Sequence, residues 1–192
     1  DQGVWVVVDE AFVDFLEEVE DFTLIPEVLR CENLLVLRSF TKFYAIPGLR
    51  LGYLAGPEAL VSRLETAKEP WTVNVLAQAV GLELCRESPV LQDYVRRSRQ
   101  LIRQERGFLI RALDEIEGLE PFPSRVNFLL VKVTNPRMDA PTLAHRLAPK
   151  GLLVRDCSRM PGLDARYFRV AVRTREENLR LIESLRGAMS EA

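Results

Sequence analysis

Two hydroxyl groups, a lysine and an arginine lie close together in the segment 39–52, which reads SFTKFYAIPGLRLG. Ser39 and Thr41 can donate hydrogen bonds to a phosphate, and the planar guanidinium of Arg50 can hold a phosphate through two charge-assisted bonds. A lysine amine that is partly desolvated beside another cation gives up its proton more readily and can form a Schiff base with an aldehyde. Lys42 is therefore a candidate nucleophile next to a phosphate site, although the same residue types are also typical of a solvated basic loop.

Apolar runs at 34–37 and 51–55 enclose this segment and predict strands that deliver its polar groups to a cleft. Gly48 and Gly52 allow backbone conformations or close approaches that a side chain would block. Another apolar run, 4–8, is typical of a strand that is buried on both faces between parallel neighbours. Asp9 follows that run directly. Because open α/β sheets bind ligands beyond the carboxyl ends of their strands, Asp9 is a candidate ligand contact, and a turn cap is the other interpretation.

The composition is that of an ordinary globular protein, with 192 residues, 47% hydrophobic content, 28% charged residues and a formal net charge of −2. This balance gives no global basic field, so neither nucleic acid nor an anionic membrane is expected as a partner. The sequence contains no apolar run of about eighteen residues and no signal-peptide pattern.

Cys31, Cys85 and Cys157 are odd in number and widely spaced. They predict no disulfide framework and no metal site, and a cytoplasmic location is expected.

Helical patterns occur at 25–30, 57–68, 75–87 and 90–116, and the apolar positions of 75–87 are expected to face the core. Strands are predicted at 127–133, 152–155 and 167–172, with a helix at 140–148 that carries His145 on its surface. Thr174 and Glu177 form a capping box for a last helix. We therefore predict an α/β fold with two parts, residues 1–88 in a large domain with a mostly parallel sheet and residues 89–192 as a small α+β domain.

Two arginines interrupt the predicted strands of the second part. Arg155 ends one strand and Arg169 lies inside another. Because burying a guanidinium without a partner is costly, such an arginine either pairs with an acid or waits for an anionic ligand. A salt bridge with Asp156 or Asp164 is the alternative to a ligand site.

The pattern Ser-x-Thr-Lys-(five residues)-Gly-Leu-Arg-x-Gly resembles the cofactor-lysine segment of the type I fold of pyridoxal-phosphate enzymes, the aminotransferase superfamily, in its histidinol-phosphate aminotransferase branch. The resemblance implies that Lys42 forms a Schiff base with pyridoxal 5'-phosphate. It also implies that Ser39, Thr41 and Arg50 hold the phosphate of the cofactor.

Asp-Glu-Ala-Phe at 9–12 is similar to the Asp-x-Ala-Tyr of the same superfamily. The resemblance implies that Asp9 pairs with the protonated ring nitrogen of the cofactor and keeps the ring able to accept electrons. Aminotransferases of this superfamily usually have tyrosine at the position of Phe12, where the hydroxyl bonds the phenolic oxygen of the cofactor. Phenylalanine cannot make that bond, so the sequence departs here from the transaminating members.

The segments around 155–171 extend the resemblance to the threonine-phosphate decarboxylases of cobalamin biosynthesis. This resemblance implies that Arg169 holds the substrate carboxylate, that Arg155 holds the substrate phosphate, and that Asn127 lies at the substrate end of the pocket. It also implies a small phosphorylated amino acid as substrate. We expect the chain to be the C-terminal part of a longer protein that forms a homodimer.

Three functions stay open from the sequence. The first is decarboxylation of L-threonine O-3-phosphate to (R)-1-amino-2-propanol phosphate, and the second is transamination of histidinol phosphate or a similar amine. The third is a fragment or binding module without catalysis. The presence of both Lys42 and Asp9 argues against the third, because binding alone needs neither residue.

Overall fold

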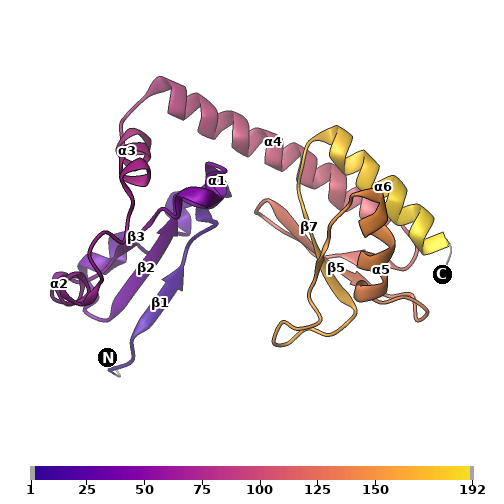
Figure 1. Cartoon of the computed structure of the whole chain (residues 1–192), viewed down its shortest axis with the longest axis horizontal. Coiled ribbons are helices and arrows are strands. Elements are labelled where there is room, and N and C mark those ends of the chain that lie inside the picture. The colour runs from indigo at the N-terminus through magenta and orange to yellow at the C-terminus, as the bar shows by residue number, and fades with distance from the viewer. Residues whose placement is uncertain (1–2, 191–192) are drawn as a thin grey trace. The chain divides into compact units, whose positions relative to one another are not determined.

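The computed structural model describes residues 3–190 (Figure 1). The chain divides into two compact units, residues 1–95 and 96–192, and the division falls within the long helix α4 (Pro89–Asp114). Each unit is described by itself. The domain boundary that we predict at residue 88 refers to a longer protein and stays a prediction.

The first unit contains a three-stranded sheet in the order β1-β2-β3. Strand β1 (Val6–Asp9) runs parallel to β2 (Leu34–Ser39), and β3 (Gly52–Ala55) is antiparallel to β2. Three short 3₁₀ helices, Val13–Phe15, Val19–Asp21 and Pro26–Leu29, connect β1 to β2. The strands lie at or next to the predicted apolar runs, and the predicted helix around Pro26 is of the 3₁₀ type.

Two helices follow the sheet of the first unit. Helix α2 (Glu58–Ala67) begins directly after Pro57, and α3 (Val75–Leu84) begins after Asn74, whose side chain accepts a hydrogen bond from the Ala77 amide at 2.9 Å. Such caps satisfy amide groups that have no partner inside a helix. Both helices confirm the predicted helical patterns.

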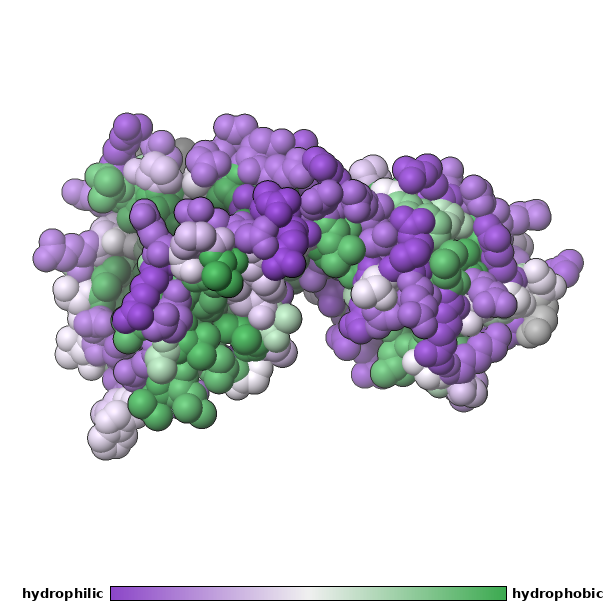
Figure 2. Space-filling model, turned by 90° about the horizontal axis from the view of Figure 1, so that it is seen from above, coloured by the Kyte–Doolittle hydropathy of each residue, from purple (hydrophilic) through white to green (hydrophobic). Residues whose placement is uncertain are grey.

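Burial in this unit differs from two expectations for the part of the chain that the structure describes. Val7 in β1 is 57% exposed and β1 lies at the edge of the sheet, so the expected strand buried between parallel neighbours refers to a longer protein and stays a prediction. In α3 only Ala77 is buried, and Val75 and Leu76 face solvent. Figure 2 shows hydrophobic surface gathered on its left-hand side, over the first unit.

The second unit contains a four-stranded antiparallel sheet in the order β4-β5-β7-β6. Its strands are β4 (Leu119–Pro121), β5 (Phe128–Val133), β6 (Arg155–Asp156) and β7 (Tyr167–Ala171). Helices α5 (Ala140–Leu147) and α6 (Arg175–Ser190) join the second half of α4 in this unit. Side chains alternate along the strands. One sheet face therefore builds a core with the helices, made from residues that include Leu109, Leu113, Leu129, Val131, Leu143, Phe168, Val170 and Leu185.

The second unit differs from the predictions in two strands. The predicted strand 152–155 is reduced to Arg155–Asp156, and β4 was not predicted, since its three residues are too few for a periodic pattern and include Pro121. The capping box is confirmed, because the Thr174 amide donates to Glu177 Oε2 at 3.2 Å and the Glu177 amide donates to Thr174 Oγ1 at 3.5 Å. His145 is exposed on α5, as expected.

Within residues 3–190, none of the helices is both long and apolar enough to span a membrane. The three cysteines are free thiols. In the same part of the chain, no cluster of acidic, histidine and cysteine side chains is arranged to hold a metal ion.

Candidate functional site

The predicted cofactor residues gather at one end of the sheet in the first unit. Asp9 is the last residue of β1 and Ser39 is the last residue of β2, so both stand at the carboxyl ends of parallel strands (Figure 1). Gly52, the first residue of β3, is paired with Ser39, which brings the start of β3 to the same end. Arg50 immediately precedes this strand. Ends of parallel strands are where open α/β sheets bind ligands.

The lysine segment between β2 and β3 contains a helical turn. Helix α1 (Phe40–Phe43) starts at Ser39, whose Oγ accepts a hydrogen bond from the Thr41 amide at 3.3 Å. Ser39 Oγ also lies 2.7 Å from Thr41 Oγ1, so the two hydroxyls are adjacent. Thr41 is buried and Lys42 is exposed. The turn therefore presents an amine to solvent beside a pair of hydroxyl groups that can bind an anion.

Aromatic side chains support this turn from within the first unit. The Tyr94 hydroxyl donates to the Phe43 carbonyl at 3.0 Å, and the Tyr94 ring stacks on Tyr44 at a centroid distance of 5.7 Å. Phe43 is buried and meets Phe15 edge-on at 5.1 Å. Aromatic pairs in these geometries add stability beyond the area that they bury. Lys42 thus lies on a turn whose neighbours are fixed by packing.

The backbone between the lysine turn and β3 is unusual. Ala45 and Arg50 both have φ of +54°, in the left-handed region that non-glycine residues rarely adopt. The Arg50 guanidinium donates to the Pro47 carbonyl at 3.0 Å and stays exposed. A Cβ added to Gly52 would lie 2.6 Å from the Arg38 carbonyl oxygen, so the predicted close approach is confirmed there, whereas open space surrounds Gly48.

Asp9 has a local partner in addition to its position at the sheet end. Its Oδ1 accepts a hydrogen bond from the Ala11 amide at 2.9 Å, and the carboxylate is exposed. This is the turn cap that the sequence left open as the other interpretation. The cap uses one oxygen and still leaves the carboxylate accessible to a ligand. Phe12 lies nearby with its ring stacked on Phe15 at 6.2 Å.

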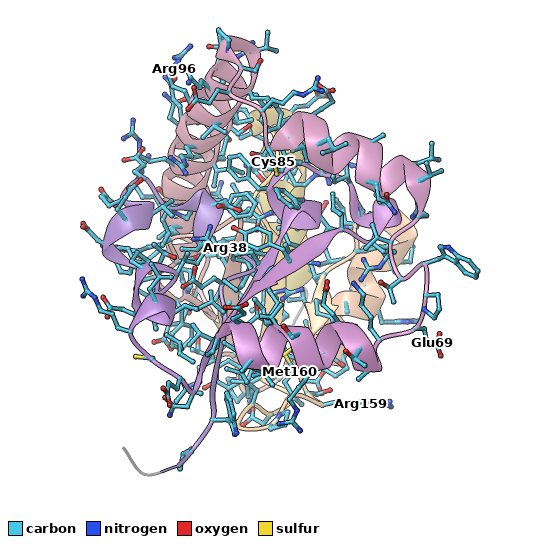
Figure 3. All side chains as sticks on the ribbon, turned by 90° about the vertical axis from the view of Figure 1, so that its left-hand side faces the viewer. Arg38, Glu69, Cys85, Arg96, Arg159 and Met160 are labelled. Atoms are coloured by element: carbon cyan, nitrogen blue, oxygen red, sulfur yellow. The ribbon has the colours of Figure 1, made fainter. Side chains whose placement is uncertain are left out.

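Sequence reasoning missed a buried ion pair directly beside these residues. Glu10 follows Asp9, and Arg38, which Figure 3 labels, precedes Ser39. The side chains of Glu10 and Arg38 are 5% and 8% exposed. Arg38 Nε donates to Glu10 Oε2 at 2.8 Å. The sequence did contain a sign of this pair, because Arg38 directly follows the apolar run Leu-Leu-Val-Leu. An unpaired charge at the end of a buried strand would be costly, so a partner could have been expected.

The predicted substrate residues lie in the second unit. Arg155 and Arg169 are paired across β6 and β7, so their side chains leave the same face of the sheet. Neither guanidinium has a carboxylate within ion-pair distance among the described residues, whereas Asp156 is bonded to Ser158 and Asp164 accepts from the Arg166 amide. The salt-bridge interpretation is therefore wrong. The Arg169 guanidinium lies 4.7 Å from the centre of the Phe128 ring.

Two further residues lie near these strands in the second unit, and by alternation from Phe128, which shares a face with Arg169, Asn127 is not on the face of the two arginines. Asn127 precedes β5, and its carbonyl accepts from the Val172 amide at 2.8 Å while its side chain is half-buried. Cys157 is buried one position beyond Asp156 in the chain. Burial raises the pKa of the Cys157 thiol, and the nearby charges of Arg169 and Arg155 oppose that rise.

The structure brings the predicted residues together in two separate sets. Asp9, Ser39, Thr41, Lys42 and Arg50 share one sheet end of the first unit, and Arg155 and Arg169 share one face of the sheet in the second. Asn127 precedes β5 in the same unit and is not brought next to the two arginines.

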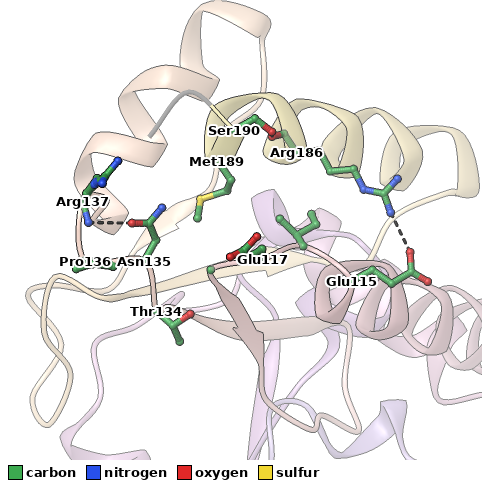
Figure 4. A pocket seen from close by; sticks show the side chains of 11 residues that line it. Glu115, Glu117, Thr134, Asn135, Pro136, Arg137, Arg186, Met189 and Ser190 are labelled. Atoms are coloured by element: carbon green, nitrogen blue, oxygen red, sulfur yellow. Dashed lines mark hydrogen bonds and ion pairs between the residues drawn. The ribbon is translucent and has the colours of Figure 1, made fainter.

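A pocket of about 760 Å³ lies elsewhere in the second unit (Figure 4). Charges of both signs line it, and Arg186 is paired with Glu115 at 2.9 Å. None of the predicted site residues contributes to it.

The whole chain resembles one family of known proteins. The family model described as aminotransferase class I and II matches residues 1–185. A threonine-phosphate decarboxylase of Salmonella typhimurium is 38% identical over 96% of this chain and 49% of its own length. A histidinol-phosphate aminotransferase of Archaeoglobus fulgidus is 39% identical over 95% of this chain and 49% of its own length.

The fold is also that of a solved structure. The histidinol-phosphate aminotransferase from Clostridium acetobutylicum superposes with a TM-score of 0.89 at 24% identity, covering 98% of this chain and 55% of that one. The chain thus spans about half the length of the relatives and of the structure that it matches.

Proposed function

Because the chain belongs to the aminotransferase class I and II family, we propose that it is part of an enzyme that decarboxylates L-threonine O-3-phosphate to (R)-1-amino-2-propanol phosphate. The fold is the type I fold of pyridoxal-phosphate enzymes, and pyridoxal 5'-phosphate is the cofactor of the family. The observation that carries the proposal is the pair of adjacent arginines, Arg155 and Arg169, which have no acidic partner in the described chain.

The first residue set fits the cofactor. When bound, pyridoxal 5'-phosphate supplies an aldehyde and a ring that accepts electrons from the α-carbon of an amino acid. Lys42 offers its exposed amine to the aldehyde, and the adjacent hydroxyls of Ser39 and Thr41 offer hydrogen bonds to the phosphate, with Arg50 as the cation. Asp9 offers its carboxylate to the ring nitrogen.

The second residue set fits a substrate with two anionic groups. Like charges directly opposite each other on neighbouring strands are unfavourable, and a bound anion offsets that cost. We assign Arg169, inside β7, to the substrate carboxylate and Arg155, at the exposed edge, to the substrate phosphate. Asn127, next to Phe128 in the chain, is the weaker candidate for a further hydrogen bond to the substrate.

Two anchors also explain how one reaction could be selected over another. A substrate held by both its carboxylate and its phosphate cannot rotate freely about the bond between its α-carbon and its nitrogen. By restricting that rotation, the two arginines would limit which bond of the α-carbon can break. A decarboxylase must break the bond to the carboxylate, and an aminotransferase must break the bond to the hydrogen and use Lys42 as the base.

The second candidate function is transamination of histidinol phosphate, and the 39% identity to the aminotransferase of Archaeoglobus fulgidus supports it. That substrate also carries a phosphate that Arg155 could hold. Phe12, in place of the tyrosine of transaminating members, favours the decarboxylase. For either activity we propose a homodimer of the full-length protein as the working form and a role of the decarboxylase in cobalamin biosynthesis.

One pair of assays separates the candidates. The full-length protein is given pyridoxal phosphate and threonine phosphate without any 2-oxo acid, and carbon dioxide release is measured. In parallel, histidinol phosphate is supplied with 2-oxoglutarate, and glutamate formation is measured. We expect carbon dioxide in the first assay. If glutamate forms and carbon dioxide does not, the aminotransferase replaces the proposed decarboxylase. If neither product forms, the third function, a binding module without catalysis, is the remaining candidate.

A further inference from the structure

The buried pair of Glu10 and Arg38 has more hydrogen bonds than an isolated ion pair. Arg38 donates through Nε to Glu10 Oε2 at 2.8 Å, through Nη1 to Asp14 Oδ1 at 2.9 Å, and through Nη2 to Thr23 Oγ1 at 2.9 Å. Glu10 in turn accepts from Thr23 Oγ1 at 2.9 Å and from the Leu24 amide at 2.7 Å. These contacts join the end of β1, the end of β2 and the segment that connects the two strands.

The register of the sheet places this pair next to the proposed cofactor residues. Asp9 is opposite Leu37, so the next position along each strand sets Glu10 opposite Arg38. Because side chains alternate between the faces of a strand, Glu10 and Arg38 share one face. Asp9 and Ser39, their neighbours in the chain, are directed to the other face. A slip of one residue between β1 and β2 would move each group to the wrong face.

A buried ion pair is a weak source of stability. Removing two charges from water costs about as much as their attraction returns, so apolar or neutral replacements of both partners are often tolerated. Buried polar networks can instead specify one arrangement of the chain, because only that arrangement satisfies every donor and acceptor. The four-residue network around Arg38 has this property, since a shifted register would leave its charges without partners.

We propose that Glu10 and Arg38 are positioning residues, which fix β1 against β2 and so hold Asp9 and the lysine turn at the separation that the cofactor requires. The inference rests on the proposed function of Asp9 and Lys42 in binding pyridoxal phosphate. It does not depend on whether the reaction is decarboxylation or transamination.

The main test is a double substitution, Glu10→Gln with Arg38→Met, in the full-length protein. The glutamine keeps an acceptor for the Leu24 amide, and its own amide group can donate to the Thr23 hydroxyl, which loses its donor Arg38. The methionine fills the volume of the arginine stem. We expect the melting temperature without cofactor to stay within a few degrees of the wild type. We expect the affinity for pyridoxal phosphate to fall about tenfold and turnover to fall about a hundredfold, because small displacements of reacting groups are costly. The absorption of the bound cofactor changes with pH, and the pH at which this change is half complete should also shift.

The second unit offers a matched control in Glu105→Gln. Glu105 is buried like Glu10, accepts from Arg175 at 3.0 Å and from Asn178 at 3.1 Å, and carries no proposed cofactor contact. This variant should lower the melting temperature and leave the cofactor absorption band and its pH midpoint unchanged. A purely structural role of Glu10 and Arg38 predicts the same pattern for the double variant.

Thr23→Val keeps the test decisive if the double variant does not fold. It removes only the hydroxyl that Arg38 and Glu10 share, at a residue outside the cofactor set. We expect a drop in cofactor affinity of a few-fold with a modest fall in melting temperature, because the hydroxyl also accepts from the Ile25 amide. If the folded variants keep the wild-type affinity for pyridoxal phosphate, the wild-type absorption and the wild-type turnover, this inference is overturned and the proposed function is not affected. A wild-type protein that binds no pyridoxal phosphate would overturn the proposed function and, with it, this inference.

Discussion

Arg155 and Arg169 lie directly opposite each other on β6 and β7, and neither has an acidic partner among the described residues. Protein surfaces normally avoid placing like charges in this position. Arg169 is partly compensated by the face of the Phe128 ring, whereas Arg155 is exposed. We propose that the pair receives anionic groups of the substrate, and this proposal leads to the first prediction.

Arg155→Ala should weaken binding of the phosphorylated substrate. Loss of one charge-assisted contact is worth about 1.5–3 kcal/mol, which raises the KM for threonine phosphate about ten- to a hundredfold. With one anchor gone, a larger share of turnovers should convert the cofactor to its amine form, which absorption measurements detect. Arg159→Ala is the matched control, because Arg159 is exposed in the same hairpin and points outward (Figure 3). An unchanged KM for Arg155→Ala would show that the phosphate is held elsewhere.

Lys42 should be the residue that borohydride links to the cofactor in the full-length protein. Its amine is exposed on α1 beside the Ser39 and Thr41 hydroxyls, so an aldehyde can reach it. Peptide mass analysis after reduction identifies the labelled lysine. Lys68→Arg, a change at an exposed lysine paired with Glu65, serves as the control and should keep full labelling. A label on any other lysine would remove the central assignment.

Asp9→Asn should separate folding from catalysis. Asparagine can still accept the hydrogen bond from the Ala11 amide, so the turn after β1 and the melting temperature should be preserved. The loss of the negative charge next to the cofactor ring should lower turnover by about a hundredfold or more while much cofactor stays bound. Steady-state kinetics together with cofactor absorption provide the measurement. Turnover at the wild-type level would mean that Asp9 does not contact the ring nitrogen.

Tyr94→Phe should loosen the turn that carries Lys42. The substitution keeps the ring stacked on Tyr44 and removes only the hydroxyl that donates to the Phe43 carbonyl at 3.0 Å. The expected loss is about 1 kcal/mol in the free energy of unfolding of the first unit, since one partly buried carbonyl loses its donor. Denaturant titration measures this loss. No change in stability would mean that water replaces the hydroxyl at no cost.

Glu177 should make the second unit sensitive to acid. Its hydrogen bonds with Arg173 and with Thr174 lower its pKa from 4.5 to about 2. A carboxylate with a lowered folded-state pKa stabilises the fold above its unfolded pKa, and this contribution is lost as pH falls through the folded value. The melting temperature should therefore fall between pH 4.5 and about 2, and Glu177→Gln should reduce that fall. Glu176→Gln, at the exposed neighbour, should leave the profile unchanged.

Local patterns predicted most of the elements. The apolar runs before Asp9 and Ser39 gave two paired strands, and the alternation at Phe128–Val133 gave the central strand of the second sheet. The capping box at Thr174 gave the start of α6. Each of these signals lies within a few residues of the element that it forms, which is why one sequence was sufficient.

The missed features depend on partners distant in the sequence or on the backbone. Arg38 meets Glu10 across 28 residues, and no local period announces that contact. The left-handed conformations at Ala45 and Arg50 occur at residues that usually avoid them. The exposure of Val75 and Leu76 follows from which elements cover α3, and helical spacing alone does not contain that information.

The uneven distribution of the buried core has a consequence for native-state dynamics. The large hydrophobic cluster belongs to the second unit, whereas the first unit buries far fewer apolar side chains. Local unfolding requires less free energy where fewer apolar contacts must break. Amide hydrogens in β5 and β7 should exchange with solvent most slowly, and those of β1 should exchange early. Limited proteolysis should accordingly release a resistant fragment that begins within α4, which would make the second unit the part of the chain that folds independently.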